Sequence, residues 1–350
     1  MKTVKFLSLI ISVIITFSCN QKKIGKWIVE SQTFIYSDEN KPTPECHAST
    51  IEFSDNRILA AWFGGVHERH PNVGIWFSTN NGNYWSTPVE VISGYVSEDE
   101  RYPLWNPVLW NYKEDKLFLF YKMGPSPSTW WGMYMVSLDG GNSWSEPRRI
   151  PDPFVGPIKN KPVLLSNGKL LCPSSSEHDG WRTHFELFDP ETEAWEAFTK
   201  PPQQGDYSSI QPTVFQHKNG SLQALTRTKE GVMAETWSSD MGKSWTKLEA
   251  GPLPNNNSGF DGVTLSDGTF LMVYNPTGKS EEHWGGARYP LVVGVSTDGN
   301  EWQQILTLEE GPGEFSYPAV IQSPDGKVHV TYTHNRLKVA YVVLQRVNTE

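Results

Sequence analysis

Hydrophobic and polar residues alternate in short runs along most of the chain, and the runs come in pairs that are separated by turn residues. In TVFQHKNGSLQAL (213–225), two alternating runs flank Lys-Asn-Gly, a sequence that commonly joins two antiparallel strands. Comparable turns are SDN, KED, SNG, KNG, SDG and PDG, at 54–56, 113–115, 166–168, 218–220, 266–268 and 324–326. Six hairpins predict six copies of one β-sheet unit.

A motif that ends in tryptophan recurs between these hairpins. Its Asp or Asn can hydrogen-bond the backbone of its own turn, its Gly can adopt a positive φ, and its Trp can pack on a neighbouring sheet. Successive copies lie about 50 to 60 residues apart, a spacing typical of four-stranded propeller blades. The copies are STNNGNYW, SLDGGNSW, FDPETEAW, SSDMGKSW and STDGNEW, ending at Trp85, Trp144, Trp195, Trp245 and Trp302.

These repeats predict an all-β fold, a six-bladed β-propeller that forms a single domain over residues 27–350. The last blade has no copy of the motif and ends with LKVAYVVLQRV (337–347), while WIVESQTFIY (27–36) has no blade of its own. We expect this N-terminal strand to join the C-terminal blade and close the ring, because closure removes exposed sheet edges. Cys46 and Cys172 fall on inner strands of different blades and are expected to be buried free thiols.

The first residues follow a different pattern. Two lysines precede FLSLIISVIITF, an apolar run that is short for a membrane span, and TFSC then ends at Cys19. This pattern predicts a lipoprotein signal peptide over residues 1–19, lipidation of Cys19, and a tether over residues 20–26. An ordinary signal peptide with a chance cysteine is the alternative. We expect a lipoprotein of the bacterial cell envelope, and the NQKK run that follows favours the periplasmic side over the cell surface.

The composition excludes some partners. The formal net charge is −9 and the basic residues are scattered, so a nucleic-acid partner is not expected and an anionic ligand would need a local cationic pocket. Cysteine spacing indicates no metal site. We expect a monomer without cofactor that touches a membrane only through its lipid anchor.

The loops at one end of a propeller converge on the central channel, so functional residues are expected there. Arginine forks in these loops suit a carboxylate or sulfate, and tryptophan faces suit a sugar ring. Lys159 and Lys161 alternate with the strand period, so both are expected to point into the channel. Pairing of the arginines with nearby acids, or simple packing of His47 and Tyr317, are the competing interpretations. The predicted substrate-binding residues are Arg227, Arg288, Arg336, Lys159, Lys161, Gln211, Asp261 and Trp130, for an acidic oligosaccharide.

The motifs PECHASTI, AAWFGG, GPIKNKPVLLSNG and FSYPAVIQSPDGKVHVTYTHNR, together with the tryptophan repeats, resemble the sialidase (neuraminidase) superfamily of BNR-repeat propellers over about residues 40 to 345. The resemblance implies three arginines on a carboxylate, a tyrosine nucleophile with a glutamate, and an aspartate acid/base. By position, Arg227 and Arg288 match two of the arginines and Tyr317 matches the tyrosine.

Three expected residues differ from this pattern. His47 or Cys46 stands in place of the first arginine, Gln211 in place of the glutamate, and Glu68, His67 or Asn72 near the position of the aspartate. A glutamine cannot take a proton from a tyrosine, whose ordinary pKa near 10 makes it a poor nucleophile without help. This difference argues against hydrolysis of a sialoside.

The remaining parts suit elimination on a uronic acid at a non-reducing end. Cations would stabilise charge on the carboxylate while His47 or Tyr317 removes the C5 proton and the other protonates the group that leaves C4. The leaving group would be a sugar for a lyase or hydroxide for a dehydratase. Hydrolysis, of the sialidase type or with two carboxylates among Glu45, Glu68 and Glu177, is the alternative, and a non-catalytic glycan-binding lipoprotein is the second. The predicted catalytic residues are His47, Tyr317 and Glu68.

Overall fold

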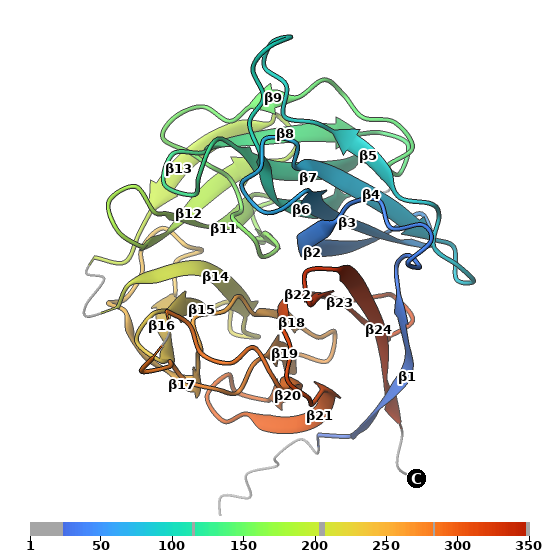
Figure 1. Cartoon of the computed structure of the whole chain (residues 1–350). Coiled ribbons are helices and arrows are strands. Elements are labelled where there is room, and N and C mark those ends of the chain that lie inside the picture. Colours follow the sequence, from blue (N-terminus) through green and yellow to red (C-terminus); the bar gives the residue numbers. More distant parts are fainter. Residues whose placement is uncertain (1–23, 114–115, 203–206, 283, 348–350) are drawn as a thin grey trace, which may run out of the picture.

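The computed structural model describes residues 24–113, 116–202, 207–282 and 284–347. The predicted signal peptide and Cys19 lie outside these residues. Within them, no helix is long and apolar enough to cross a membrane. Every regular element is a strand, and the strands form six antiparallel four-stranded sheets arranged as blades around a central axis (Figure 1). The six-bladed propeller predicted from the repeats is confirmed.

The first three blades follow the chain in order, each from its innermost to its outermost strand. Blade one is β2 (Glu45–Ser54), β3 (Arg57–Gly65), β4 (Gly74–Asn80) and β5 (Val89–Ile92); blade two is β6 (Leu104–Tyr112), β7 (Lys116–Met123), β8 (Trp131–Ser137) and β9 (Arg148–Arg149); blade three is β10 (Val163–Leu164), β11 (Leu170–Ser176), β12 (Arg182–Asp189) and β13 (Ala194–Thr199).

The last three blades have the same order, except that the N-terminal strand supplies the outermost strand of blade six. Blade four is β14 (Ser209–Gln216), β15 (Leu222–Thr228), β16 (Val232–Ser238) and β17 (Glu249–Pro254); blade five is β18 (Asp261–Thr264), β19 (Phe270–Tyr274), β20 (Leu291–Ser296) and β21 (Gln303–Glu309); blade six is β22 (Phe315–Gln322), β23 (Val328–His334), β24 (Lys338–Val347) and β1 (Lys26–Phe34).

The ring closes as expected, because β1 pairs with β24 from Lys26↔Val347 to Phe34↔Ala340. The first and last parts of the chain therefore share one sheet, and blade six depends on residues about 300 positions apart. Pairing satisfies the backbone groups of β24 that would otherwise form an open sheet edge.

The repeat motif forms the turn between the third and fourth strands of a blade. In blade two, Asp139 accepts hydrogen bonds from the backbone N–H and hydroxyl of Ser143 at 2.8 and 2.6 Å, and these bonds lower the pKa of Asp139 to about 2. Trp144 packs edge-on against Phe77 of blade one, 5.8 Å between ring centroids. The motif thus fixes its own turn and joins its blade to the preceding one.

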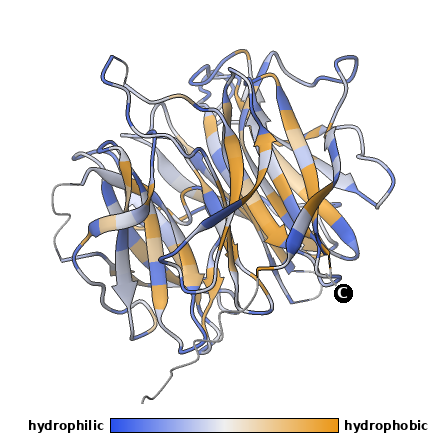
Figure 2. Ribbon diagram, turned by 90° about the horizontal axis from the view of Figure 1, so that it is seen from below, coloured by the Kyte–Doolittle hydropathy of each residue, from blue (hydrophilic) through white to orange (hydrophobic). Residues whose placement is uncertain are grey.

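The core lies between neighbouring sheets. Figure 2 shows hydrophobic residues along the strands and hydrophilic residues in most of the connecting loops. Cys46 and Cys172 are buried free thiols on β2 and β11, as predicted. The sheets thus form a rigid frame that holds the loops at both ends of the strands.

Candidate active site at the channel mouth

A β-bulge recurs near the mouth end of four innermost strands. The pairing register shifts after His47 in β2, after Trp105 in β6, after Ile210 in β14 and after Ser316 in β22. The next residue in each strand has a positive φ, which costs energy for a residue other than glycine and often marks a functional site. These residues are Ala48, Asn106, Gln211 and Tyr317, with φ values of 50°, 39°, 53° and 52°.

The bulges surround a small pocket at the centre of the mouth, with a volume of about 140 Å³. A cavity of about 150 Å³ holds one benzene molecule, so this pocket has room for one six-membered ring. Its walls combine charged, amide and aromatic side chains. The lining residues are His47, Glu68, Arg69, Trp105, Asn106, Pro127, Trp130, Glu177, Trp181, Ile210, Gln211, Arg227, Trp284 and Tyr317.

Arg227, on β15, is a buried cation whose hydrogen-bond partners in the described residues are all neutral. Its Nε and Nη2 donate to Asn257 Oδ1 at 3.1 and 3.0 Å, and its Nη1 donates to Gln211 Oε1 at 3.1 Å and to Tyr317 Oη at 2.5 Å. The side chain is only 3% exposed. Glu177 in the pocket wall attracts this charge without hydrogen-bonding to it. A buried charge without a direct ion pair is costly, so this position favours an anionic group of a ligand.

Tyr317 lies at the centre of the site and is almost fully buried. Its oxygen accepts hydrogen bonds from Arg227 Nη1 and from Gln211 Nε2, the latter at 3.4 Å. Because both neighbours donate to this oxygen, the phenolic hydrogen is left to point at a ligand. The two donors also stabilise negative charge on the oxygen after it gives up its proton.

His47 packs against Tyr317 with 4.2 Å between ring centroids. Burial, followed by the charges of Arg336, Arg288, Arg227 and Lys159, holds the pKa of His47 well below its usual value of 6.5. Its Nδ1 is buried and has no hydrogen-bond partner among the described residues. The ring is therefore neutral near pH 7, and a neutral imidazole has a lone pair that can accept a proton.

The other two predicted arginines are neutralised by acids. Glu314 accepts hydrogen bonds from Arg288 Nη1 at 2.5 Å and from Arg336 Nε at 3.0 Å, and Glu68 accepts one from Arg336 Nη1. Arg288 still lies 5.9 Å from the centre of the Tyr317 ring. These arginines add positive potential to the mouth, but each is already paired.

The structure places Lys159 and Lys161 in different environments. Lys159 is buried, with its ammonium 5.7 Å from the centre of the Tyr317 ring. The ammonium donates to Asn160 Oδ1, Phe260 O and Pro318 O. All three donors are used, so Lys159 holds the backbone next to Tyr317 and has none left for a substrate.

Lys161 is turned away from the mouth and forms an ion pair with Glu52 at 3.0 Å. The expectation that both lysines point into the channel fails because the chain bends at residues 159–160 and β10 begins only at Val163. Strand alternation does not apply before that point.

Asp261 also differs from its expected role in substrate binding. Its carboxylate accepts hydrogen bonds from Thr213 Oγ1 at 3.1 Å and from the Val320 N–H at 2.9 Å, and burial raises its pKa. Asp261 thus links blades four, five and six beneath the site.

Aromatic rings form the rim of the pocket. Trp130 packs edge-on against Trp105 at 5.8 Å, and Trp181 against Trp284 at 6.2 Å between centroids. Trp181 Nε1 donates to Glu177 at 3.0 Å, and burial raises the pKa of Glu177. Such a carboxyl group keeps its proton to higher pH than an exposed one, which suits a general acid.

The structure adds residues to the site that were not predicted. Asn257 holds the Arg227 guanidinium, and Glu314 joins Arg288 to Arg336. A proline follows three of the bulge residues near the start of their innermost strands, namely Asn106, Gln211 and Tyr317. This repeated Xaa-Pro pair is the sequence signal from which the bulges could have been predicted. No group of three or more His, Cys, Asp or Glu side chains that could hold a metal ion occurs within the described residues.

The six-bladed ring and its arginine- and tyrosine-bearing mouth define a sialidase-like BNR propeller. The model of the BNR repeat-like domain matches residues 56–330. The chain therefore belongs to the BNR repeat-like domain family.

Solved structures agree with this fold. A protein of unknown function from Dyadobacter fermentans has 15% identity and a TM-score of 0.74, covering 92% of this chain and 99% of that one. The intramolecular trans-sialidase from Ruminococcus gnavus has 13% identity and a TM-score of 0.70, covering 91% and 99%. A mutant sialidase of Trypanosoma rangeli with trans-sialidase activity has 16% identity and a TM-score of 0.67, covering 89% of this chain and 58% of that one. No curated protein matches the chain.

Proposed function

We propose that this protein is a carbohydrate-active enzyme that acts on the acidic sugar at the non-reducing end of an oligosaccharide, by elimination on a uronic acid. The observation that carries the proposal is the contact of Arg227 with Tyr317, beside the neutral His47. This arrangement joins a site for a carboxylate to two groups that exchange protons.

Arg227 would bind the uronate carboxylate. Its hydrogen-bond partners Asn257, Gln211 and Tyr317 are neutral, so the carboxylate would supply the missing negative charge. As the C5 proton leaves, negative charge spreads onto the carboxylate oxygens, and a fixed cation stabilises this charge more strongly in the transition state than before it.

His47 would act as the base and Tyr317 as the acid. The imidazole takes the C5 proton, the electron pair forms the C4–C5 double bond, and the bond from C4 to its oxygen breaks. That oxygen receives the phenolic proton of Tyr317, and the resulting phenolate is stabilised by Arg227 and Gln211. If that oxygen is a hydroxyl group, the uronate is itself the terminal residue and the enzyme is a dehydratase. If the oxygen bears a sugar, the uronate is the second residue of the chain and the enzyme is a lyase that removes the terminal sugar.

The dimensions of the pocket support action on a terminal sugar. Its volume of about 140 Å³ and its tryptophan rim leave room for one ring in the mouth. The product would be an unsaturated uronate, alone or at the end of the remaining chain.

Hydrolysis is the second candidate, and Glu177 favours it. Its raised pKa and its place in the pocket wall suit a general acid. The resemblance of the fold to sialidases supports the same class of reaction. Gln211, which bonds to Tyr317 where a glutamate would be needed, favours elimination over a tyrosine nucleophile.

The test is product analysis with a panel of uronate-rhamnose, ulvan-type, pectic and sialylated oligosaccharides. Mass spectrometry and ultraviolet absorbance would follow each incubation. A product that absorbs as an unsaturated uronate is expected. A saturated sugar released with uptake of water would overturn elimination, and loss of that activity in Glu177→Gln would assign the acid.

We also propose that the protein is a lipoprotein on the periplasmic side of the bacterial envelope, which rests on the pattern that ends at Cys19. Mass spectrometry of the mature N-terminus is expected to find lipid on Cys19. A mature chain that begins elsewhere without lipid would overturn this assignment.

A further inference from the structure

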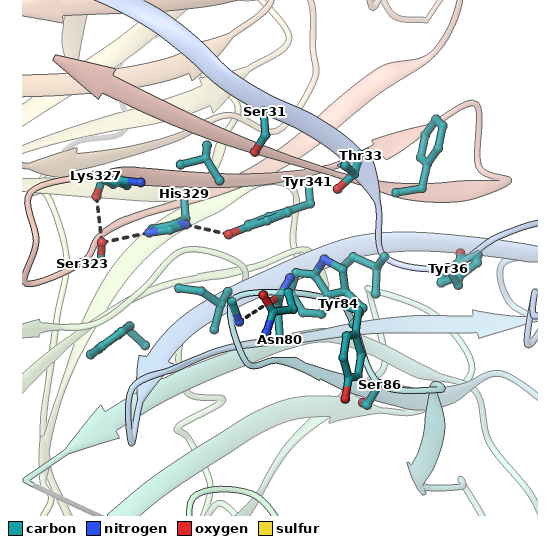
Figure 3. A pocket seen from close by; sticks show the side chains of 18 of the residues that line it. Ser31, Thr33, Tyr36, Asn80, Tyr84, Ser86, Ser323, Lys327, His329 and Tyr341 are labelled. Carbon is teal, nitrogen blue, oxygen red and sulfur yellow. Dashed lines mark hydrogen bonds between the residues drawn. The ribbon is translucent and has the colours of Figure 1, made fainter. Parts of the chain in front are cut away.

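A second and larger cavity lies between blades six and one, away from the channel mouth (Figure 3). This groove has a volume of about 1070 Å³. It is bounded by the outer strand β1, by the turn after β22, and by the turn that follows β4. Tyr317 lies near the start of β22 and Ser323 directly follows its last residue, Gln322, so about 20 Å of nearly extended chain separates the groove floor near Ser323 from the proposed active site.

The groove exists because the repeat turn of blade one does not fill the space beside blade six. In blade two, a Cβ added to Gly141 would lie 2.7 Å from Phe77, and in blade four one added to Gly242 would lie 2.7 Å from Leu171. At Gly82, the same position in blade one, it would meet nothing within 4 Å. The turn is thus packed on the preceding blade in those two copies and stands off it here.

Trp85 of this turn follows the usual pattern, since it packs edge-on against Tyr341 of blade six at 5.0 Å between centroids. Tyr84, next to it, is 67% exposed and lines the groove. Phe34, on the opposite wall, is 40% exposed. An aromatic face open to solvent in a groove suits the C–H face of a sugar ring.

The rest of the lining is mainly neutral and able to form hydrogen bonds. The carboxamides of Asn56 and Asn83 and the hydroxyls of Ser31 and Thr33 belong to exposed residues of the groove. Figure 3 shows Ser31 and Thr33 on one side and Asn80, Tyr84 and Ser86 on the other. Amides and hydroxyls next to aromatic rings match the hydroxyl groups and apolar faces of saccharides.

The charged residues of the groove are paired with one another or with its backbone. Lys327 forms an ion pair with Glu30 at 2.7 Å, and Asp325 accepts hydrogen bonds from Ser323 Oγ and from the Lys327 N–H. In contrast to the mouth, with its buried Arg227, the groove contains no buried arginine or lysine among the residues that line it. An uncharged ligand is therefore the better match.

We propose that this groove binds a neutral stretch of a saccharide chain, as a second site that does not take part in the reaction at the mouth. The binding is independent of the proposed function, because none of its residues lines the mouth. Such a site would hold a polysaccharide near the enzyme while the mouth acts on acidic ends.

The test is the retardation of the protein in native gels that contain xyloglucan, arabinoxylan, galactan or galactomannan, with polygalacturonate as the acidic comparison. At least one neutral polymer is expected to retard the protein. Tyr84→Ala, which removes the exposed ring, and Thr33→Trp, which fills the groove from β1, are each expected to weaken this binding about tenfold or more.

Two control variants separate the groove from other effects. Tyr95→Ala removes a tyrosine of similar exposure outside the groove, and Arg227→Lys weakens ligand binding at the mouth. Both should be retarded like the unchanged protein. The proposal would be overturned if no neutral polymer retarded the protein. It would also be overturned if Tyr84→Ala and Thr33→Trp were retarded as strongly as the unchanged protein. Light scattering that finds a dimer dissociated by Tyr84→Ala would also overturn it, in favour of a second copy in the groove.

Discussion

The mouth and the groove each contain a buried histidine, but the two histidines have different partners. His329 in the groove bonds to Ser323 Oγ through Nε2 at 2.8 Å and to Tyr341 Oη through Nδ1 at 2.7 Å. His47 at the mouth has no partner for its Nδ1 among the described residues. Burial holds the pKa of both below 6.5, to about 4 for His329. Low basicity alone therefore does not mark a catalytic histidine. The two rings differ because His329 uses both nitrogens within the protein, whereas His47 lines the mouth pocket with Nδ1 unused.

The arginines of the mouth also differ in whether their charge is paired within the protein. Arg227 has neutral partners, whereas Arg288 and Arg336 share Glu314. The mouth is a place where hydrogen-bonding capacity and charge are left unmatched, which costs stability and prepares for a ligand. In the groove, the charges are matched and the open surface is neutral.

The largest expected effect is on turnover. Tyr317→Phe and His47→Gln should each lower kcat by about 10²- to 10⁴-fold, because each removes a group that transfers a proton. Binding of the substrate should persist in both variants, as measured by calorimetry. His329→Gln is the matched control in the groove, and its kcat should equal that of the unchanged protein.

Near-normal turnover in Tyr317→Phe or His47→Gln would remove that residue from the mechanism. If His329→Gln lost turnover while its melting temperature stayed unchanged, His47 would no longer be distinguished from His329 as the catalytic histidine.

A smaller effect is expected on affinity for the acidic ligand. Arg227→Lys keeps the charge but loses the planar fork, and a hydrogen bond to a charged group contributes about 1.5–3 kcal/mol, or roughly 10- to 150-fold in Kd. Arg288→Lys should weaken binding less, because Glu314 already neutralises Arg288. Kd values from calorimetry in the Tyr317→Phe background test this order, and the reverse order would move the carboxylate site to Arg288.

The fold was predictable because its determinants are local. Each of the six hairpin turns marks one blade, so counting the turns counts the blades. The tryptophan motifs, as at Asp139 and Trp144, fix the turns of five of them. The pairing of β1 with β24 could also be predicted from the sequence, because the N-terminal strand had no blade of its own and the last blade lacked a strand.

The site was only partly predictable. Tyr317, Arg227 and His47 could be placed at one mouth because the loops of a propeller converge there. The choice of partners depends on side-chain geometry: Asn257 holds Arg227, and Glu314 bonds to Arg288. The groove could not be predicted from the sequence, because the Gly82 turn resembles the other copies of the motif and differs only in what lies beside it in space.

The pH dependence of stability follows from the histidines. A folded-state pKa below the unfolded value means that the unfolded chain binds the proton first, so stability is retained above about pH 6.5 and decreases as pH falls toward the folded pKa. For His329, the free energy of unfolding should decrease by about 1.4 kcal/mol per pH unit between pH 6.5 and about 4. Asp325, Lys327 and Glu30 face this ring and contribute to its pKa.

Urea unfolding between pH 7.5 and 4.5 tests this expectation. His329→Gln should reduce the slope of the unfolding free energy against pH by about 1.4 kcal/mol per pH unit, which corresponds to one proton. His47→Gln should reduce this slope by a similar amount. Parallel pH profiles for His329→Gln and the unchanged protein would show that His329 is protonated equally in the folded and unfolded states.

The smallest expected effect concerns the turn that leaves the groove open. Gly82 and Gly141 occupy the same position of the motif with φ values of 99° and 89°, so Gly→Ala at either site carries a similar backbone strain of about 1–2 kcal/mol. At Gly141 the new methyl group would also lie 2.7 Å from the Phe77 ring, and overpacking adds about 1–3 kcal/mol. Gly141→Ala should therefore lower the free energy of unfolding by about 1 kcal/mol or more beyond Gly82→Ala. Equal losses in urea unfolding would mean that the Gly82 turn packs on blade six in solution and that the groove is closed there.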